Sequence, residues 1–542
     1  MSHTQYLLKI NFYCVVFLLL FSCNKNEVAI DEIRNSPTDV IEANDQLTVF
    51  SSDPLSTKTT MDVNRNFYWN SYEKIWVKTA EDTYLDSYRS ELISNGSGKY
   101  PSAKFYFNQN LKEESYEIYY TGNYSSSAQS VTISQAQQQS SWDNADHIGW
   151  SGDCGTDKAI KKANNKYDFK LNHKAAYLIF RPYKATNITA SWKIMSIEII
   201  DNDGNTLCGK YPLELEGLKT TDVTNGNSNV VLYCSSSGFE LETSASQSCF
   251  AVIQPGTHSL TIRYNIKPEK DVNGNAGKTF AIEKKITSIT EFAPNSVTRI
   301  QHKMSAMSID SLGFDMRQWG ATDNFYATYD GSSPAAGNYD KTTLFPNQLT
   351  TDLWKDLPTA NEAAWYLLRG DVRVDRNTCW FIDGTGASIR KNGVWILKKE
   401  HIDGFTDEVC PMGRDLNGVD GNYNYSYRPQ TLSVYINVAF PELIDNYENG
   451  GVPNSDEIDK YFFLPAFGRI LSNTDHDSEY TTVYYWTKSP SPLTNGSGVR
   501  LYRMAYAIMF DTNEDTGQAP LARLTPWEAR RVGIGLAPAW FK

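Results

Sequence analysis

The sequence predicts a mainly β protein in which two tandem β-sandwiches are followed by an α+β domain. Aromatic residues make up 13% of the 542 residues, and such side chains suit the pleated, half-buried faces of sheets. Short apolar runs recur at close spacing, separated by Ser, Asn, Gly and Thr, as in β-sandwiches. One later run has helical spacing, which predicts that the last domain adds a helix.

The first 23 residues predict an export signal of the lipoprotein kind. Lys9 precedes the uncharged run Phe12–Phe21, which is too short to span a bilayer, since spanning needs about 20 apolar residues. The run ends in LFSC, which resembles a bacterial lipobox and implies that Cys23 is acylated, for example with palmitate. The alternative is an ordinary export signal in which Cys23 has no role.

A propeptide is predicted over residues 24–58, and the first sandwich over residues 59–168. Residues 24–46 are polar and predict a disordered spacer, whereas LTVF (Leu47–Phe50) predicts a strand. Within the sandwich, strands are expected at Lys104–Asn108, Tyr116–Asn123 and Ser130–Ser134. Residues 135–168 are rich in Gln, Ser and Asn, which predicts a long loop or a short helix.

The second sandwich is predicted over residues 169–305, starting with the apolar run Phe169–Tyr183. The segment His258–Lys267 alternates strictly, so that one face of a strand carries Leu260, Ile262, Tyr264 and Ile266. A hairpin turn is expected at Asn202–Asn205, where glycine accepts positive φ without a steric cost.

The α+β domain is predicted over residues 314–542, after a short linker at Ser305–Gly313. A helix is expected within Trp354–Gly370, with Thr359 or Asn361 as its N-cap. Its apolar face is predicted to carry Ala363, Ala364, Leu367 and Leu368. Later apolar and aromatic segments of this domain are Tyr461–Ile470, Thr481–Pro490, Met504–Asp511 and Arg530–Trp540.

Residues 45–305 resemble the fimbrillins, the pilin-like lipoproteins of Bacteroidetes. The resemblance rests on the sequences STKTT, IWV, LNHKAAYLIF and EFAPNSVTRI, together with Trp69. It implies two transthyretin-like β-sandwiches. Residues 320–542 resemble the C-type-lectin-like domains, including the major paralogous domains, at the ends of Bacteroidetes surface proteins. That likeness rests on the ordered motifs LPT, LPAFG, YYWTKSP, AYAIMFD and RRVGIGLAP.

The fimbrillin resemblance implies maturation by an Arg- or Lys-specific protease. The protease removes an N-terminal strand, and a strand of the next subunit takes its place by β-augmentation. The order of motifs predicts a cut between Lys58 and Thr59, which would release LTVF. Arg34 and Arg65 are alternative sites, and a cut at Arg34 would leave LTVF in place. A further alternative is that Lys58 is a surface residue and the strand stays, as in an anchor subunit.

A tip position is expected, because the chain ends in APAWFK immediately after the closing lectin-like motif and leaves no donor strand. The protein is then an adhesin at the tip of a fimbrium, outside the outer membrane, that binds a glycan or protein on a host or bacterial surface. The alternative is a permanently lipidated outer-membrane glycan-binding protein.

Acidic, amide and tyrosine side chains in two predicted loops are the candidates for ligand binding. Oxygen groups bond sugar hydroxyls while aromatic rings stack on sugar faces. The same oxygens suit Ca²⁺, although the twelve-residue calcium loop is absent, and solvated turns are the alternative. The predicted residues are Asp415, Asn417, Asp420, Tyr423, Asp475, Asp477 and Glu479.

No enzymatic activity, catalytic residue, metal site or required cofactor is expected. None of the seven histidines lies in an HExxH motif, and no GxSxG or P-loop is present. The formylglycine-generating enzymes that share the lectin-like fold use a cysteine pair, but Cys379 and Cys410 lie in no redox or copper pattern. Beyond Cys14 and Cys23, six cysteines allow fifteen disulfide connectivities.

The charge of the chain also limits its partners. The formal net charge is -12 and there is no basic block, which argues against nucleic acid. Other fimbrillin subunits are the expected protein partners, through donor-strand exchange, and a membrane is expected only through the lipid of the precursor.

Overall fold

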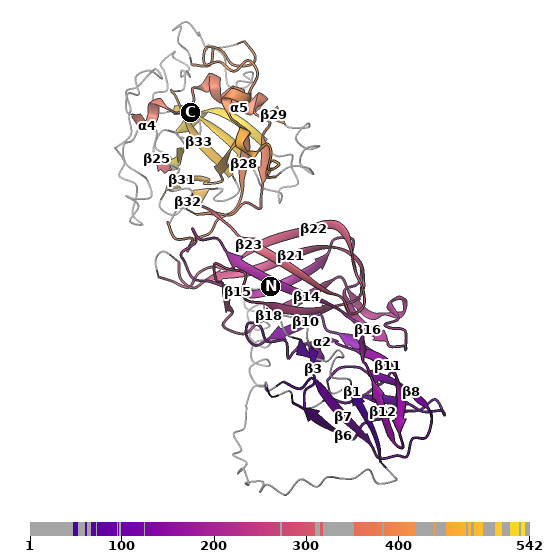
Figure 1. The fold of residues 1–542 in the computed structure, drawn as a ribbon. Coiled ribbons are helices and arrows are strands. Elements are labelled where there is room, and N and C mark those ends of the chain that lie inside the picture. Colours follow the sequence, from indigo (N-terminus) through magenta and orange to yellow (C-terminus); the bar gives the residue numbers. More distant parts are fainter. Residues whose placement is uncertain are drawn as a thin grey trace, which may run out of the picture. The chain divides into compact units, whose positions relative to one another are not determined.

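The computed structural model divides the chain after Gln46 into two units, and the second, Leu47–Lys542, contains all the described residues. The mainly β class predicted from the sequence is confirmed (Figure 1). The structure describes residues 47–52, 60–61, 67–71, 73–94, 96, 99–123, 125–271, 274–308, 315–317, 352–381, 384–413, 415–417, 438–439, 451–472, 475–477, 482–490, 504–511, 521–529 and 533–536.

The first domain is built on one nine-stranded sheet with the order β5-β4-β8-β11-β12-β1-β7-β6, in which β13 also pairs with β11. The strands are β1 (Thr48–Ser52), β4 (Trp76–Lys78), β5 (Tyr84–Asp86), β6 (Arg89–Ile93), β7 (Ser102–Phe107), β8 (Ser115–Tyr120), β11 (Gly155–Ala163), β12 (Lys166–Phe169) and β13 (Asn172–His173).

The sheet closes on itself because its two terminal strands, β5 and β6, are separated by only two residues. The amide of Ser87 donates to the carbonyl of Ile75 (2.9 Å), and the amide of Tyr88 donates to the carbonyl of Tyr106 (3.1 Å). The enclosed core is largely aromatic and includes Phe50, Trp69, Phe105, Ile118, Tyr120, Tyr167 and Phe169.

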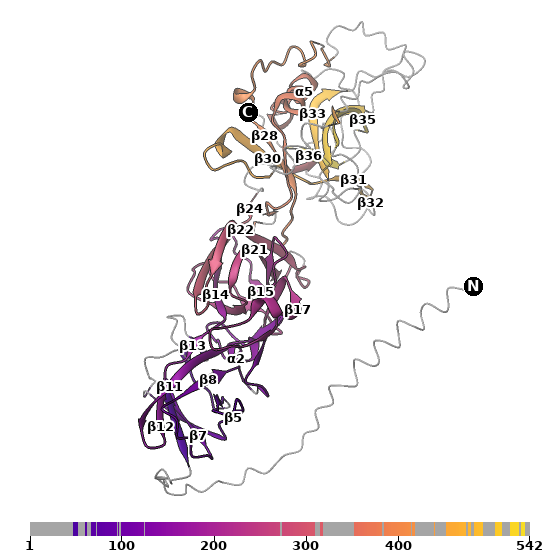
Figure 2. The same cartoon turned by 90° about the vertical axis from the view of Figure 1, so that its right-hand side faces the viewer.

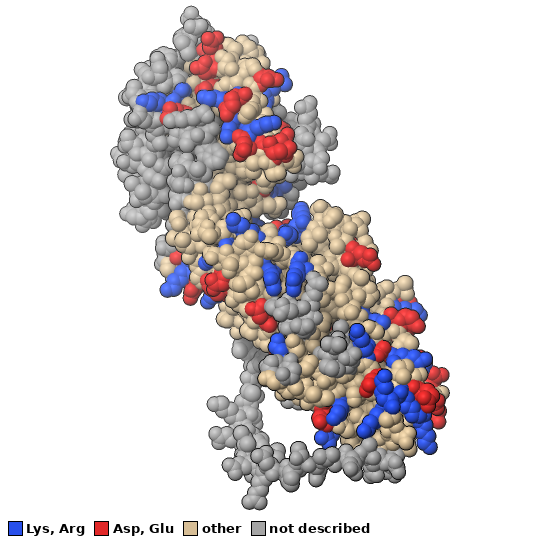
Figure 3. All heavy atoms as spheres, in the orientation of Figure 1, with Lys and Arg blue, Asp and Glu red and all other residues tan. Residues whose placement is uncertain are grey.

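The outward-facing side chains of strand β12 are charged. Along β12, Tyr167 and Phe169 are buried, whereas Lys166 and Asp168 are exposed. Figure 3 shows charged side chains of both signs over the face of the first domain where β11 and β12 lie. The alternation along the strand therefore separates the aromatic core from a charged outer surface.

The second domain packs three sheets on one core. Their orders are β10-β18-β15-β21-β22, with β19 paired to β15, then β20-β14-β23, and β17-β16-β9. The strands are β9 (Ser130–Ile133), β10 (Ala136–Gln139), β14 (Ala176–Lys184), β15 (Trp192–Asp201), β16 (Cys208–Pro212), β17 (Thr224–Asn227), β18 (Asn229–Cys234), β19 (Phe239–Glu240), β20 (Cys249–Ile253), β21 (Gly256–Pro268), β22 (Phe280–Phe292) and β23 (Val297–Met304).

The sheets cross the domain boundary that the sequence predicts at residue 168. Strands β9 and β10 precede that boundary, yet β9 pairs with β16 and β10 pairs with β18 of the second domain. The chain then returns to the first sheet through α2 (Ile148–Ser151), β11 and β12. The long loop or short helix expected over residues 135–168 is therefore wrong, because β10, β11 and most of β12 lie there. This segment, which is rich in Gln, Ser and Asn, lacks a clear apolar alternation, and alternation in any case does not identify the partners of a strand.

The third domain combines a short helical region with two main sheets, and Figure 2 shows α5 beside its strands. The sheet orders are β29-β35-β34-β33-β36-β31-β32, with β25 paired to β36, and β26-β28-β30. The elements are β25 (Asp315–Arg317), α4 (Asp352–Lys355), α5 (Ala360–Arg369), β26 (Arg373–Asp375), β28 (Gly393–Leu397), β29 (Val438–Ala439), β30 (Tyr461–Pro465), β31 (Arg469–Ser472), β32 (Asp475–Asp477), β33 (Thr482–Pro490), β34 (Met504–Asp511), β35 (Leu521–Ala529) and β36 (Gly533–Leu536).

Helix α5 begins with a capping box, and Thr359 is the N-cap. Its side chain accepts from the amide of Glu362 (3.2 Å), and the Glu362 carboxylate accepts from the amide of Thr359 (2.7 Å). Two amides that the helix leaves unpaired are thereby satisfied. The predicted apolar face is confirmed, since Ala363, Ala364 and Leu367 are buried in the domain core.

The predicted linker contains a short strand. Strand β24 (Met307–Ser308) pairs in parallel with β27 (Trp380–Phe381), and Phe381 is buried in the core of the second domain. The indole of Trp192 donates to the carbonyl of Gly386 (2.8 Å), which adds a contact between β15 and the third domain. Residues 381 and 386 therefore contact residues of the second domain.

Two histidines of the second domain are held neutral by their surroundings. His147 donates from Nε2 to the carbonyl of Phe250 (2.9 Å), and burial lowers its pKa to about 4. Its Nδ1 is buried and has no partner in the described part of the chain. Burial, assisted by Lys284, also lowers the pKa of His302 to about 4. Protonation of either ring would therefore place a cation in an apolar core.

Mild acid should destabilise the second domain. The histidine pKa is about 6.5 in an unfolded chain, so between pH 6.5 and 4 the unfolded state binds protons that the folded state does not. The neutral His147 ring makes its full contribution to the free energy of unfolding above pH 6.5. About 2 kcal/mol of that free energy should be lost by pH 5. The free energy of unfolding, measured in urea at pH 7.5 and at pH 5, should differ less between the two pH values in His147→Gln than in the unmodified protein. The exposed His401→Gln variant is the control, and equal pH dependence in both variants would contradict the burial of a neutral His147.

Candidate functional site

Strand β1 lies inside the first sheet, with a hydrogen-bonded neighbour on each side (Figure 1). It pairs in parallel with β12, where Phe50 is opposite Tyr167. It pairs antiparallel with β7, where Phe50 is opposite Phe105. Both rows of backbone groups of β1 are therefore used in the sheet, and its loss would leave β7 and β12 unpaired along one side.

The burial of β1 alternates, and its inward-facing residues are Thr48, Phe50 and Ser52. The Phe50 ring is fully buried and stacks on Tyr167 with a centroid distance of 4.7 Å. It also meets Phe107 edge to face at 5.1 Å. Burial of one such ring contributes about 1.5–3 kcal/mol, and the aromatic geometry adds to it.

Hydroxyl groups fix both ends of β1. The Thr48 hydroxyl donates to the carbonyl of Gln109 (2.7 Å) and accepts from the amide of Leu111 (3.0 Å). The Ser52 hydroxyl accepts from the amide of Ala103 (2.9 Å) and from the indole of Trp69 (2.9 Å). Each of these donors is buried or partly buried, so a strand without the two hydroxyls would leave them unpaired.

The strand that comes after β1 belongs to another sheet. Strand β2 (Thr60–Met61) pairs antiparallel with β3 (Phe67–Tyr68), and Phe67 lies in the core of the second domain. Its ring stacks on His173 at 4.3 Å. Strand β2 is thus paired outside the sheet that contains β1, whereas Trp69, farther along the chain, lies in the core of the first domain with Phe50. Lys58, Thr59 and Cys23 themselves lie outside the described residues.

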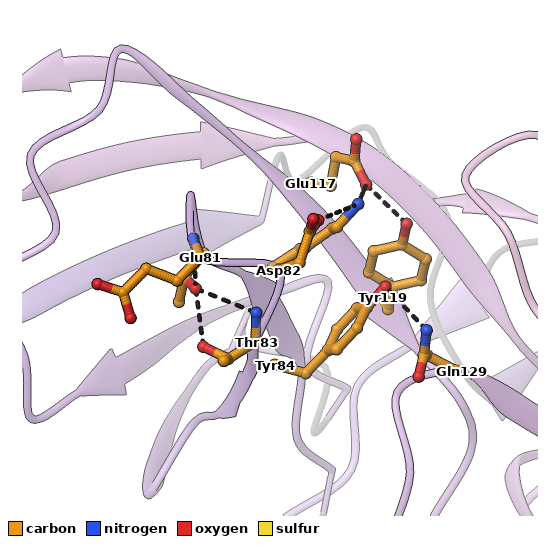
Figure 4. A network of polar contacts seen from close by, with 9 residues as sticks. Glu81, Asp82, Thr83, Tyr84, Glu117, Tyr119 and Gln129 are labelled. Carbon is orange, nitrogen blue, oxygen red and sulfur yellow. Dashed lines mark hydrogen bonds and ion pairs between the residues drawn. The ribbon is translucent and has the colours of Figure 1, made fainter.

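A polar network fixes the β4–β5 hairpin to β8 (Figure 4). The ammonium of Lys78 lies 3.0 Å from Asp82 and 3.9 Å from Glu117. Tyr119 donates to Glu117 (2.7 Å), and burial together with this carboxylate raises the pKa of Tyr119. The phenol therefore stays a donor at all physiological pH values. This network stabilises an outer part of the sheet rather than the position of β1.

Two of the predicted ligand residues, Asp415 and Asn417, lie in a hydrogen-bond network at the start of α5. The Asn361 amide donates to Asp415 (3.0 Å) and to the carbonyl of Glu408 (2.8 Å). The Asn417 side chain accepts from the Ser489 hydroxyl (2.7 Å). The network joins the loop that carries Asp415 to the helix and to β33, so both residues have a structural role. Their binding of a ligand stays a prediction.

The other predicted ligand residues are not brought together by the described structure. Asp475 and Asp477 lie on β32, which pairs with β31. Asp420, Tyr423 and Glu479 lie outside the described residues. Within the described part of the chain, no group of three or more His, Cys, Asp or Glu side chains is arranged to hold a metal ion.

Sequence reasoning missed the part that Asn361 plays, because it considered this residue only as a possible N-cap. The residue is fully buried in the first turn of α5, between Ala360 and the buried Ala363 and Ala364. An amide within such an apolar helical face is the signal that could have identified it, since a buried amide needs several partners.

Cys379 and Cys410 are buried in different cores. Cys379 belongs to the core of the second domain and Cys410 to that of the third. Burial raises the pKa of Cys379 to about 11, so its thiol is protonated at neutral pH. Neither thiol is exposed to solvent. Among the described residues, no helix is both long and apolar enough to cross a membrane.

No protein-family model matches the chain, and no curated protein matches it. Among solved structures, it is similar to a Bacteroides ovatus protein provisionally described as a cell adhesion protein, with 12% identity and a TM-score of 0.26. That match covers 47% of this chain and 92% of the other. A fimbrial assembly protein from Parabacteroides distasonis is 9% identical with a TM-score of 0.24, over 48% of this chain and 91% of the other.

A fimbrial protein from Bacteroides ovatus matches over 90% of this chain and 97% of its own, with 9% identity and a TM-score of 0.22. At these identities and TM-scores, the similarities carry no conclusion about the function of this chain. The geometry of β1 is therefore the stronger guide to function.

Replacement of Phe50 should weaken the first domain far more than replacement of its neighbour. Phe50→Ala should lower the free energy of unfolding by about 3–5 kcal/mol, because it removes a buried ring and leaves a cavity. Val49→Ala is the matched control, since Val49 is half-buried on the other face of the same strand. Urea unfolding followed by tryptophan fluorescence measures both. Similar losses in the two variants would contradict the inward position of Phe50.

Proposed function

We propose that the protein is a subunit of a cell-surface fimbrium that joins other subunits by exchange of strand β1. The observation that carries the proposal is the position of β1 between β7 and β12, directly before the predicted cleavage site. After cleavage between Lys58 and Thr59, only non-covalent contacts would hold β1 in the sheet. A strand from another subunit would then compete for the same backbone partners.

The interior of the sheet defines what the incoming strand must supply. It needs a large apolar side chain for the space that Phe50 fills among Tyr167, Phe107 and Tyr116. The incoming strand also needs a small hydroxyl side chain two residues before this apolar residue and another two residues after it, in place of Thr48 and Ser52. The spacing follows from the two-residue period of a strand. These requirements give the exchange its register and its specificity.

The third domain is the proposed recognition head. Its resemblance to C-type-lectin-like domains and the predicted ligand residues support binding of a glycan or protein on a target surface. A recognition domain in addition to the sheet that contains β1 suits a tip position, in which the subunit receives a strand and contacts the target. The lipid at Cys23 would then deliver only the precursor to the outer membrane.

A second function is a permanently lipidated outer-membrane glycan-binding protein. The completeness of the first sheet with β1 in place favours it, because the uncut chain is already a fully paired structure. In that case β1 is a permanent structural strand, and the lipid on Cys23 anchors the mature protein permanently in the membrane.

The mature N-terminus should distinguish the two functions. Mass spectrometry of surface protein is expected to find Thr59 as the first residue, and acylated Cys23 in assembled protein would contradict the fimbrial proposal. Lys58→Ala should retain residues 24–58 and abolish incorporation into surface polymers, as seen by gel electrophoresis without heating. Lys58→Arg tests the protease class, and Arg34→Ala is the control that should mature normally.

A peptide of residues 47–52 should bind the trimmed protein. Protein cleaved after Lys58 and freed of its own strand under mild denaturation has unpaired β7 and β12, and the peptide restores both ladders. The same peptide with Phe50→Ala should bind at least tenfold more weakly, since one buried ring is worth about 1.5–3 kcal/mol. Fluorescence anisotropy measures both affinities. Equal binding of the two peptides would contradict exchange through this position.

A further inference from the structure

Two cysteines of the second domain face one another across its core. Cys234 is the last residue of β18, and Cys249 is the first residue of β20. The two strands belong to different sheets, and both side chains are completely buried. The sequence allowed fifteen connectivities for six cysteines, so it did not identify this pair.

The side chain of Gln139 connects the two strands that carry the cysteines. Gln139 is the backbone partner of Cys234 in the pairing of β10 with β18. Its side-chain oxygen accepts from the amide of Phe250 (2.9 Å), and its side-chain nitrogen donates to the carbonyl of Ser248 (3.1 Å). The residues before and after Cys249 are therefore both bound to the residue beside Cys234.

The two cysteine side chains are neighbours in the core, and both thiols are free in the structure. Burial raises the pKa of Cys249, and a hydrogen bond with the Cys234 thiol raises it further. Cys208, in contrast, donates to the carbonyls of Asn227 and Asn229. Cys154 lies where the chain enters β11, and its thiol is next to Lys174 and Ala175. Cys234 and Cys249 are thus the pair of cysteines whose strands the fold brings together through Gln139.

We propose that Cys234 and Cys249 form a disulfide that links the two facing sheets of the second domain. The bond closes the segment 235–248, which contains β19. In an exported protein this cross-link would lower the conformational entropy of the unfolded chain and thereby stabilise the sandwich. The inference does not depend on strand exchange or on ligand binding.

The reaction is a thiol–disulfide exchange that requires an oxidant of the disulfide class. The thiolate of one cysteine attacks the sulfur–sulfur bond of the oxidant, which releases one thiol and forms a mixed disulfide. The second cysteine attacks the mixed disulfide and releases the second thiol. The two cysteines lose two electrons and two protons, and the oxidant gains both. Since the folded core encloses both thiols, the exchange must take place before β18 and β20 pack together.

Peptide mapping tests the proposal directly. The full chain is refolded with oxidised and reduced glutathione, and free thiols are then trapped with N-ethylmaleimide in denaturant. Trypsin leaves both cysteines within Thr220–Arg263, so the bond should appear as an unlabelled peptide lighter by two hydrogen atoms. Cleavage after Glu240 and Glu242 then separates the cysteines, and the two fragments should stay linked until reduction.

Thermal unfolding gives a second, independent measurement. Reduction should lower the unfolding temperature of the second domain by about 5–10 °C, as expected for a closed loop of about 15 residues. The double variant Cys234→Ser and Cys249→Ser should show no such shift on reduction. Cys208→Ser is the matched control, because it removes a buried thiol of the same domain and should retain the shift.

Labelling of both Cys234 and Cys249 by N-ethylmaleimide without prior reduction would overturn the proposal. Linkage of either cysteine to Cys154 or Cys208 would also overturn it. The peptide map of the unmodified chain decides the matter even if the serine variants do not fold.

Discussion

The backbone pairing of β1 with β7 and β12 is the interaction on which the first domain depends. The strand lies in the middle of the sheet order, so its hydrogen bonds connect the part made of β5, β4, β8, β11 and β12 with the part made of β7 and β6. The parallel pairing with β12 and the antiparallel pairing with β7 use both edges of β1. Its three inward side chains complete the aromatic core and satisfy buried donors of Ala103, Leu111 and Trp69.

The chain also ties the first two domains together by crossing between them. After β10 pairs with the second domain, β11 returns to the first, and the return starts at a buried cluster of Asp153, His173 and Tyr177. His173 Nδ1 lies 2.6 Å from Asp153, and the Tyr177 hydroxyl donates to the same carboxylate oxygen. A buried carboxylate is tolerated only when it is paired in this way. The cluster therefore fixes the position where β11, β13 and β14 meet, next to the ring of Phe67.

The predictions from sequence succeeded where a local pattern carries the information. The strict alternation of His258–Lys267 corresponds to β21, and the apolar face of Ala363, Ala364 and Leu367 corresponds to α5. Thr359 was one of two candidate N-caps, and hydrogen-bond geometry distinguished it from Asn361. The signal of LTVF as a strand was also local, and the structure extends that strand to Ser52.

What the sequence by itself determined was the mainly β class, the α5 helix and the presence of a strand at LTVF, because residue periodicity and turn chemistry are properties of neighbouring residues. Only the tertiary structure decided that this strand lies between β7 and β12, and that β9 and β10 cross into the second domain. It also decided that Asp415 bonds to Asn361 and that Cys234 meets Cys249. These facts join residues that are distant in the chain, and the choice among possible partners depends on how whole sheets pack around a shared core.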